Sequence, residues 1–251
     1  MKLVKSLSLI TVIYLFISPV YAKDIQVAVA ANFTAPMKQI AQQFEKTSGY
    51  KVSLAFGSSG KFFAQIQNGA PYEIFLSADQ AKPIAMEKAG LMVPDSRFTY
   101  AIGTLALWSP KAGVVKDGGE PLQSGQFNKL SLANPKLAPY GLAATQTLEK
   151  MQLTAATRAK WVQGENISQT YQFVASGNAD IGFVALSQIM SNGKITSGSS
   201  WLVPSEYYSP IRQDAVLLNA GADDAGAKAL LSYLQSDAAR AIIHAYGYKT
   251  E

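Results

Sequence analysis

Strand-like and helix-like segments alternate from residue 25 onward, and this alternation constrains the fold more than any other feature of the sequence. Residues 25–30 form a short β-branched run, and the apolar residues between 33 and 44 then recur at helical spacing. The same order of a strand and a helix returns at 51–69 and again at 73–90. Consecutive units of this kind are typical of a parallel sheet with helices on both faces, so we predict an α/β fold.

A second set of strand and helix segments follows residue 129. The sequence predicts strands at 129–133, 180–186, 201–203 and 212–218, and helices at 141–151, 155–161, 167–176, 225–235 and 237–245. Between the two sets, residues 98–108 are predicted to form one long β segment, and residues 109–119 an exposed connection rich in Pro, Gly and Lys.

These two sets predict two lobes, each a mostly parallel sheet flanked by helices. We expect residues 23–104 and 211–251 to form lobe 1, and residues 105–210 to form lobe 2. Sheets of this type bind ligands at the carboxyl ends of their strands, which predicts a ligand cleft between the lobes.

Residues 1–22 are predicted to be a cleavable signal peptide. Two lysines open the segment, an apolar stretch runs from Leu7 to Ile17, and Ala22 ends it with Val20 two residues before. The apolar stretch is shorter than the roughly 18 residues that a membrane-spanning helix needs, which disfavours an anchor. We therefore expect cleavage before Lys23 and a soluble, exported product.

Composition excludes several kinds of site. The chain has no cysteine and one histidine, His244, which excludes disulfides, thiol nucleophiles and metal sites built from cysteine or from two histidines. The formal net charge is +5, and loss of the two N-terminal lysines leaves 20 basic against 17 acidic residues. These charges are scattered along the chain, so no nucleic-acid partner is predicted.

Two strand-to-helix loops carry the polar residues of most interest. The first holds Asn32 and Thr34, and the second is Gly57-Ser58-Ser59-Gly60. Free N–H groups and the helix dipole make such helix starts favourable for anions. Neither loop contains an Asp or a Glu. The plainer interpretation is that Asn32 and Ser59 only cap their helices.

The second loop does not fit two familiar motifs. Residues 57–61 lack the four residues that separate the glycines of a P-loop, and Phe62 stands where that motif needs Ser or Thr for magnesium. A secreted serine hydrolase with Ser59 as nucleophile is a weaker alternative, because no G-x-S-x-G elbow is present and His244 is the only imidazole.

Five segments carry a resemblance to a known family. They are AVAANFTAPMKQIAQQFE at 28–45, AFGSSGKFFAQIQNGAPYEIFLSADQ at 55–80, ANPKLAPYGLAATQTLEK at 133–150, GENISQTYQFVASGNADIGFVALSQ at 164–188 and SDAARAIIHAYGY at 236–248. The sequence resembles the periplasmic molybdate-binding proteins of ABC uptake systems, within the type II solute-binding proteins. The resemblance implies the two-lobe periplasmic-binding-protein (type II) fold.

The resemblance also implies which residues hold an oxyanion through neutral donors. Asn32 stands at the first-loop position, where its carboxamide can donate, and Ala31 adds a backbone amide. Ser59 stands at the second-loop position, with its hydroxyl and its N–H as donors. In the second lobe the matching positions are Tyr140 and Ile167, the latter through its amide at a helix start.

One position departs from the family pattern. Many members supply a tyrosine hydroxyl where this sequence has Ala185. Either the hydroxyl of Tyr140 replaces it from across the cleft, or the site has one donor fewer.

The implied function is that of a periplasmic binding protein without enzymatic activity. It would capture molybdate, and also tungstate, as a ligand rather than a cofactor, and deliver it as a monomer to an ABC permease in the membrane. No metal-cation ligands are expected. Sulfate, phosphate or chromate are the alternative ligands, and an extracytoplasmic sensor would use the same site. A dianion without a proton needs donors only, which fits the absence of carboxylates from both loops.

Overall fold

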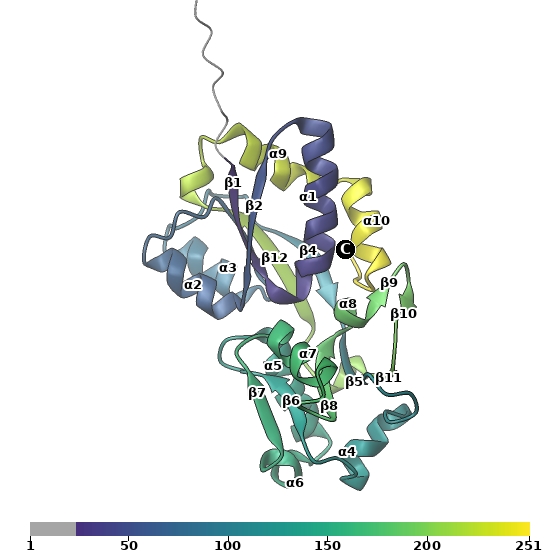
Figure 1. The fold of residues 1–251 in the computed structure, drawn as a ribbon. Coiled ribbons are helices and arrows are strands. Elements are labelled where there is room, and N and C mark those ends of the chain that lie inside the picture. Colours follow the sequence, from purple (N-terminus) through teal and green to yellow (C-terminus); the bar gives the residue numbers. More distant parts are fainter. Residues whose placement is uncertain (1–23) are drawn as a thin grey trace, which may run out of the picture.

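The computed structural model describes residues 24–251, so the predicted signal peptide at 1–22 lies outside the described residues. Two lobes lie one above the other in Figure 1, each built around a five-stranded sheet. The described residues contain no helix with the length and apolar character that a membrane crossing requires. The predicted two-lobe α/β fold is confirmed.

The first sheet has the strand order β2-β1-β3-β12-β4. Its strands are β1 (Ile25–Ala30), β2 (Val52–Gly57), β3 (Ile74–Leu76), β4 (Phe98–Gly103) and β12 (Ile211–Leu217). The first three are parallel, whereas β12 runs antiparallel to both β3 and β4. The helices of this lobe are α1 (Thr34–Ser48), α2 (Ser59–Gln67), α3 (Ala81–Lys88), α9 (Ala225–Tyr233) and α10 (Asp237–Ala245).

The first strand–helix unit shows why the sequence folds this way. The strand β1 is buried along nearly its whole length because helices cover both faces of the sheet. A single 3-10 turn, η1 (Ala31–Phe33), leads into α1, which buries Met37, Ile40 and Phe44. Burial of each such side chain stabilises the fold by about 1.5–3 kcal/mol. The helix ends at Gly49, whose φ of 78° is the left-handed conformation that glycine adopts without strain.

The second sheet has the order β11-β5-β8-β6-β7. Its strands are β5 (Leu105–Ser109), β6 (Leu130–Ala133), β7 (Trp161–Gly164), β8 (Ile181–Ala185) and β11 (Ser199–Leu202). Again three strands, β6, β7 and β8, are parallel, whereas β5 runs antiparallel to its two neighbours, β8 and β11. The helices here are α4 (Glu120–Ser124), α5 (Pro139–Lys150), α6 (Thr154–Arg158), α7 (Ile167–Ala175) and α8 (Leu186–Ile189). Smaller elements are β9 (Met190–Ser191), β10 (Lys194–Ile195), η2 (Asp117–Gly119), η3 (Ser205–Tyr207) and η4 (Asn219–Gly221).

The structure corrects the helix predicted at 155–161. The helix α6 ends at Arg158, and Trp161 opens strand β7. This strand lies at the edge of its sheet and pairs only with β6 among the described strands. Its four residues, WVQG, are too few to show a strand period. The helical pattern of the preceding residues therefore predicts a helix that continues into the start of this strand. The short elements α4, β9 and β10 were not predicted.

The β segment predicted at 98–108 is two strands in two sheets. The strand β4 ends at Gly103 in the first sheet, and β5 begins at Leu105 in the second. The chain returns between β11 and β12, from Leu202 to Ile211. We propose that these two crossings divide the chain into the lobes 23–104 with 211–251, and 105–210.

Candidate functional site

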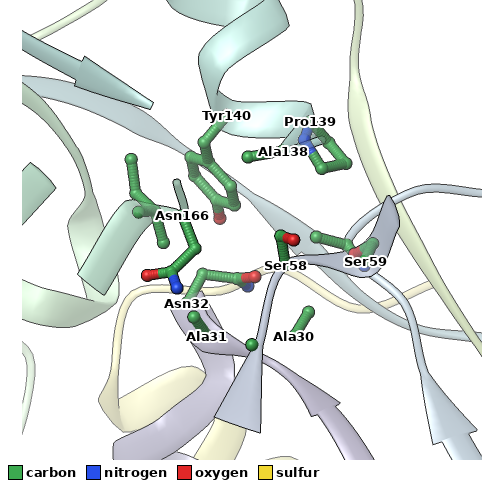
Figure 2. Close-up of a pocket in the computed structure, with 12 residues that line it drawn as sticks. Ala30, Ala31, Asn32, Ser58, Ser59, Ala138, Pro139, Tyr140 and Asn166 are labelled. Carbon is green, nitrogen blue, oxygen red and sulfur yellow. The ribbon is translucent and has the colours of Figure 1, made fainter. Parts of the chain in front are cut away.

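A small cavity lies between the lobes, and all five residues singled out from the sequence line it. Its lining residues are Ala30, Ala31, Asn32, Gly57, Ser58, Ser59 and Ala78 on one side, and Ala138, Pro139, Tyr140, Asn166 and Ile167 on the other (Figure 2). These residues follow the carboxyl ends of the parallel strands β1, β2 and β3 in the first sheet, and β6 and β7 in the second. The cavity therefore lies where ligand sites of open α/β sheets are found.

The size of the cavity restricts what it can hold. Its volume is about 10 Å³, measured as the space open to the centre of a water molecule. On this measure a cavity needs about 10–15 Å³ to hold one water, whereas pockets for drug-sized organic ligands span roughly 300–1,000 Å³. The cavity has room for one small solute.

Four helical segments begin at this cavity. They are η1, α2, α5 and α7, whose first-turn amides at the cavity belong to Ala31, Asn32, Ser59, Tyr140 and Ile167. The first N–H groups of a helix have no partner within it, and they carry the positive end of the helix dipole. Several such helix starts around one space make a binding site for an anion.

The helix caps leave these amides open. Asn166 caps α7, and its Oδ1 accepts hydrogen bonds from the N–H groups of Ser168 and Gln169, each at 3.0 Å. The preceding amide, that of Ile167, takes no part in the cap. In α5 the first residue is Pro139, which has no N–H, so Tyr140 supplies the first amide of that helix.

Two buried serines line the cavity from the second loop. Ser59 Oγ accepts a hydrogen bond from the N–H of Ala78 at 2.9 Å, so its own O–H is left to donate. Ser58 is the N-cap of α2, and its Oγ accepts from the N–H of Lys61 at 3.4 Å. Sequence reasoning singled out Ser59 and missed Ser58. The capping position directly before the helix was the signal that could have found it.

Tyr140 projects from the start of α5 toward the loops of the first lobe (Figure 2). It is 1% exposed, and its Oη accepts a hydrogen bond from Nε2 of Gln213 at 3.3 Å. Burial raises the pKa of Tyr140 well above its ordinary value of 10, and the neighbouring Tyr248 raises it further. The hydroxyl therefore stays protonated at neutral pH and can donate.

Asn32 differs from its expected role. Its Nδ2 donates to Oε1 of Gln213 at 2.7 Å and to Oη of Tyr248 at 2.8 Å. A carboxamide has two N–H bonds, and both are used here. In this arrangement both N–H groups of the side chain are bonded to the protein, so donation by this side chain to a ligand stays a prediction. Asn32 and Ala31 can still contribute their backbone amides.

Ala185 supplies no donor to the cavity. It ends β8, is fully buried, and its N–H donates to Oε1 of Gln188 at 2.9 Å. Among the residues that line the cavity, the hydroxyls are those of Ser58, Ser59 and Tyr140.

No ionised side chain lines the cavity among the described residues. Lys61, two residues after Ser59, forms an ion pair with Glu165 of the other lobe, with Nζ to carboxylate distances of 3.3 and 3.4 Å. Both side chains are about half exposed, so the pair contributes little, roughly 0–1 kcal/mol.

His244 does not support the serine hydrolase alternative. Its ring lies on α10 and is exposed, and its Nε2 pairs with Oγ1 of Thr250 at 2.9 Å. A nucleophilic serine needs a base within hydrogen-bond reach, whereas Ser59 Oγ is bonded to a backbone amide.

The two lobes contact each other around the cavity. The N–H of Gly60 donates to the carbonyl oxygen of Leu137 at 2.9 Å, and Ser168 Oγ donates to that of Ala31 at 3.1 Å. The structure is therefore a closed arrangement in which both lobes enclose the cavity.

Comparison with known proteins gives a consistent family. The model of the family described as "Bacterial extracellular solute-binding protein" matches residues 25–249. The molybdate-binding protein ModA of Azotobacter vinelandii is 57% identical over 227 residues, which is 90% of each chain. ModA of Rhodobacter capsulatus is 48% identical over 233 residues, 93% of this chain and 91% of the relative. The solved structure of a periplasmic molybdate-binding protein of A. vinelandii has a TM-score of 0.88 and 42% identity, and the match covers 91% of this chain and all of that one.

Proposed function

The chain belongs to the bacterial extracellular solute-binding proteins, and from this membership we propose that it captures molybdate in the periplasm for an ABC transporter. The observation that carries the proposal is the donor set of the cavity. Five first-turn amides and three hydroxyls surround a space for one small solute, with no carboxylate among the lining residues.

The chemistry of the donors suits a fully deprotonated oxyanion. A tetrahedral dianion presents only acceptors, so every protein group around it must donate. Ser59 Oγ has an acceptor position taken by the N–H of Ala78, which leaves its O–H for the ligand. Oη of Tyr140 accepts from Gln213, and its O–H can donate either to the ligand or to Tyr248. Hydrogen bonds to an ionised partner are about twice as strong as neutral ones, so several convergent donors hold the charge without a counter-ion. Monohydrogen phosphate carries a proton that would face another donor here.

The position of the site between the lobes suggests how the ligand is handed on. Tyr140 and Ile167 come from one lobe, and Ala31, Asn32 and Ser59 from the other. An anion that contacts both lobes binds the closed state more tightly than the open state, and this difference in affinity stabilises the closed state. We propose that the chain acts as a monomer, that a membrane permease distinguishes closed from open molecules, and that tungstate, which has the same shape and charge, is carried as well.

A panel of anions tests the ligand class. Molybdate and tungstate are expected to raise the thermal midpoint of the mature protein, because a ligand that binds only the folded state stabilises it in proportion to RT ln(1 + [L]/Kd). Sulfate, phosphate and chromate at the same concentration are expected to raise it less. An equal shift with sulfate would favour the alternative function, that of a binding protein for another oxyanion. No shift with any of the five anions would overturn the proposal.

Ser59→Ala is expected to weaken molybdate binding by about 1–3 kcal/mol, the range for a hydrogen bond to a charged group. The substitution removes the O–H donor and leaves the N–H of Ala78 without its acceptor. Calorimetric titration measures the change in the dissociation constant. Ser176→Ala is a matched control, because that serine is exposed and its Oγ contacts only carbonyl oxygens of its own helix and the nearby side chain of Asn178. An unchanged dissociation constant in Ser59→Ala would remove this hydroxyl from the site.

A further inference from the structure

Gln213 lies behind the cavity and does not line it, yet it contacts two of the residues that do. It is on β12, fully buried, and hydrogen-bonded to Asn32 and Tyr140. We propose that Gln213 is a positioning residue, which fixes the direction in which the Tyr140 hydroxyl donates and so keeps the cavity free of acceptors. This inference rests on the proposed binding of a tetrahedral oxyanion.

An irregularity of the sheet places Gln213 there. In the pairing of β12 with β4, Gln213 is opposite Ala101 but Asp214 is opposite Thr99, so Tyr100 is an extra residue in the ladder. Such bulges redirect side chains and are common next to functional sites. Asp214, the next residue, is also fully buried and is bonded on its own side to Arg97, Thr99 and Gln80.

The hydrogen bonds of Gln213 fix which way its amide faces. Its Oε1 accepts from Nδ2 of Asn32 at 2.7 Å and lies 3.0 Å from the hydroxyl of Tyr100, which can donate to it. Its nitrogen must therefore point the other way, where Nε2 donates to Oη of Tyr140. Because that oxygen already accepts one hydrogen bond from Gln213, the O–H of Tyr140 is directed away from Gln213, where the cavity and Tyr248 offer it acceptors.

The same residues connect the two lobes. Asn32, Tyr100, Gln213 and Tyr248 belong to the first lobe, and Tyr140 and Ser187 to the second. The carbonyl oxygen of Asn32 lies within hydrogen-bond distance of the hydroxyls of Ser187 and Tyr248, at 2.8 and 2.9 Å. The side chain of Gln213 is hydrogen-bonded to Asn32, Tyr100 and Tyr140, so its amide cannot turn over without breaking several buried hydrogen bonds.

Gln213→Glu converts this arrangement into one that responds to pH. The introduced carboxylate has no N–H, so the O–H of Tyr140 would turn toward it and present a lone pair to the ligand. Its negative charge would also repel the anion. Protonation removes the charge and restores a donor, so affinity should fall as pH rises.

The other titratable groups around Gln213 do not produce such a response near neutral pH. They are Tyr100, Tyr140 and Tyr248, and burial raises the pKa of each above 10. The carboxylates whose charges act on Tyr100 are Asp79 and Asp214, which are bonded to Lys82 and Arg97 respectively. Tyr208 acts on Tyr140, and burial raises its pKa as well.

Calorimetric titration with molybdate between about pH 6 and pH 9 tests the proposal. This pH range lies far above the ordinary carboxyl pKa of about 4.3 and below the ordinary pKa of tyrosine. The unchanged protein is expected to vary by less than about threefold. Gln213→Glu is expected to bind at least about a hundredfold more weakly at the upper end and to regain about tenfold or more at the lower end, because burial raises a carboxyl pKa. A flat profile for this variant, with binding by the unchanged protein, would overturn the inference alone.

A second measurement separates positioning from general support of the fold. Gln213→Leu removes the same hydrogen bonds without adding a charge, and we expect about tenfold weaker binding that does not vary with pH. In a Tyr140→Phe background, the same change should cost less than half as much, because the hydroxyl it positions is gone. Equal costs in both backgrounds would show that Gln213 supports only the fold. If the unchanged protein binds no tetrahedral oxyanion, the proposed function itself has failed.

Discussion

Gly103→Ala is expected to weaken molybdate binding by on the order of a hundredfold, about 2.7 kcal/mol. Gly103 ends β4 at the crossing between the lobes, opposite Ile211. A β-carbon built there would overlap Oη of Tyr140 and approach Nε2 of Gln213 to 2.7 Å. The φ of Gly103 is not in the left-handed region, so the requirement for glycine is one of space.

The size of this effect follows from how little the neighbours can move. Tyr140 is almost fully buried, and the methyl group would meet the end of a rigid ring rather than a flexible chain. Overpacking of a dense interior costs about 1–3 kcal/mol, and here the displaced group belongs to the proposed ligand site, so we expect the loss in affinity as well as in stability.

Calorimetry with molybdate and denaturant unfolding without it measure the two losses. Tyr140→Phe provides the internal control, since removal of the hydroxyl takes away the atom nearest to the new methyl group. The loss of stability caused by Gly103→Ala should therefore be smaller in the Tyr140→Phe background. Full affinity in Gly103→Ala would show that the closed cavity does not require the observed position of Tyr140.

Much of the fold could be predicted because its signals are local. The unit of β1 and α1 has a short apolar strand, a helical period and a closing glycine within 25 residues. The strand β7 was missed because four residues show no period, and its place in the sheet depends on pairing with β6, about 30 residues away. Long-range pairing decides such edge strands, and it leaves little trace in the strand itself.

The site could be predicted only as far as its loops. Asn32 and Ser59 follow strands at helix starts, and that pattern pointed to amides and hydroxyls around an anion. The resemblance added Ala31, Tyr140 and Ile167, and all five residues line one cavity.

The use of each donor depends on partners that are remote in sequence. Asn32 donates to Gln213 and Tyr248, which lie 181 and 216 residues further along the chain. No local pattern could show that its N–H groups are already committed. The one-residue shift in the pairing of β12 with β4 is likewise invisible in the residues of either strand.

Stability is expected to fall steeply between about pH 10 and pH 12, because ionised tyrosine is favoured in the unfolded chain. Burial raises the pKa of Tyr248 to about 12, whereas the unfolded residue ionises near 10. Burial also raises the pKa values of Tyr100 and Tyr140 well above 10. A raised pKa of this kind contributes its stability fully below pH 10 and loses it as pH rises through the folded value.

The expected loss of stability at high pH is large relative to the free energy of unfolding of a single domain. Two pKa units for Tyr248 correspond to roughly 2.7 kcal/mol, and Tyr100 and Tyr140 add to it. Single domains have free energies of unfolding of about 5–15 kcal/mol, so ionisation of three buried tyrosines removes a substantial share. Urea unfolding at about pH 8, 10 and 11.5 measures the loss, and tyrosinate absorbance follows the ionisation.

Tyr248→Phe isolates the contribution of one of these buried hydroxyls. The variant should be less stable at pH 8, because Asn32 loses the acceptor of one N–H, but its stability should fall less steeply above pH 10. Buried tyrosines that ionised near pH 10 without loss of folded structure would contradict the prediction. The same outcome would also imply that water reaches the interior around Tyr140 and Gln213, whose side chains are 1% and 0% exposed.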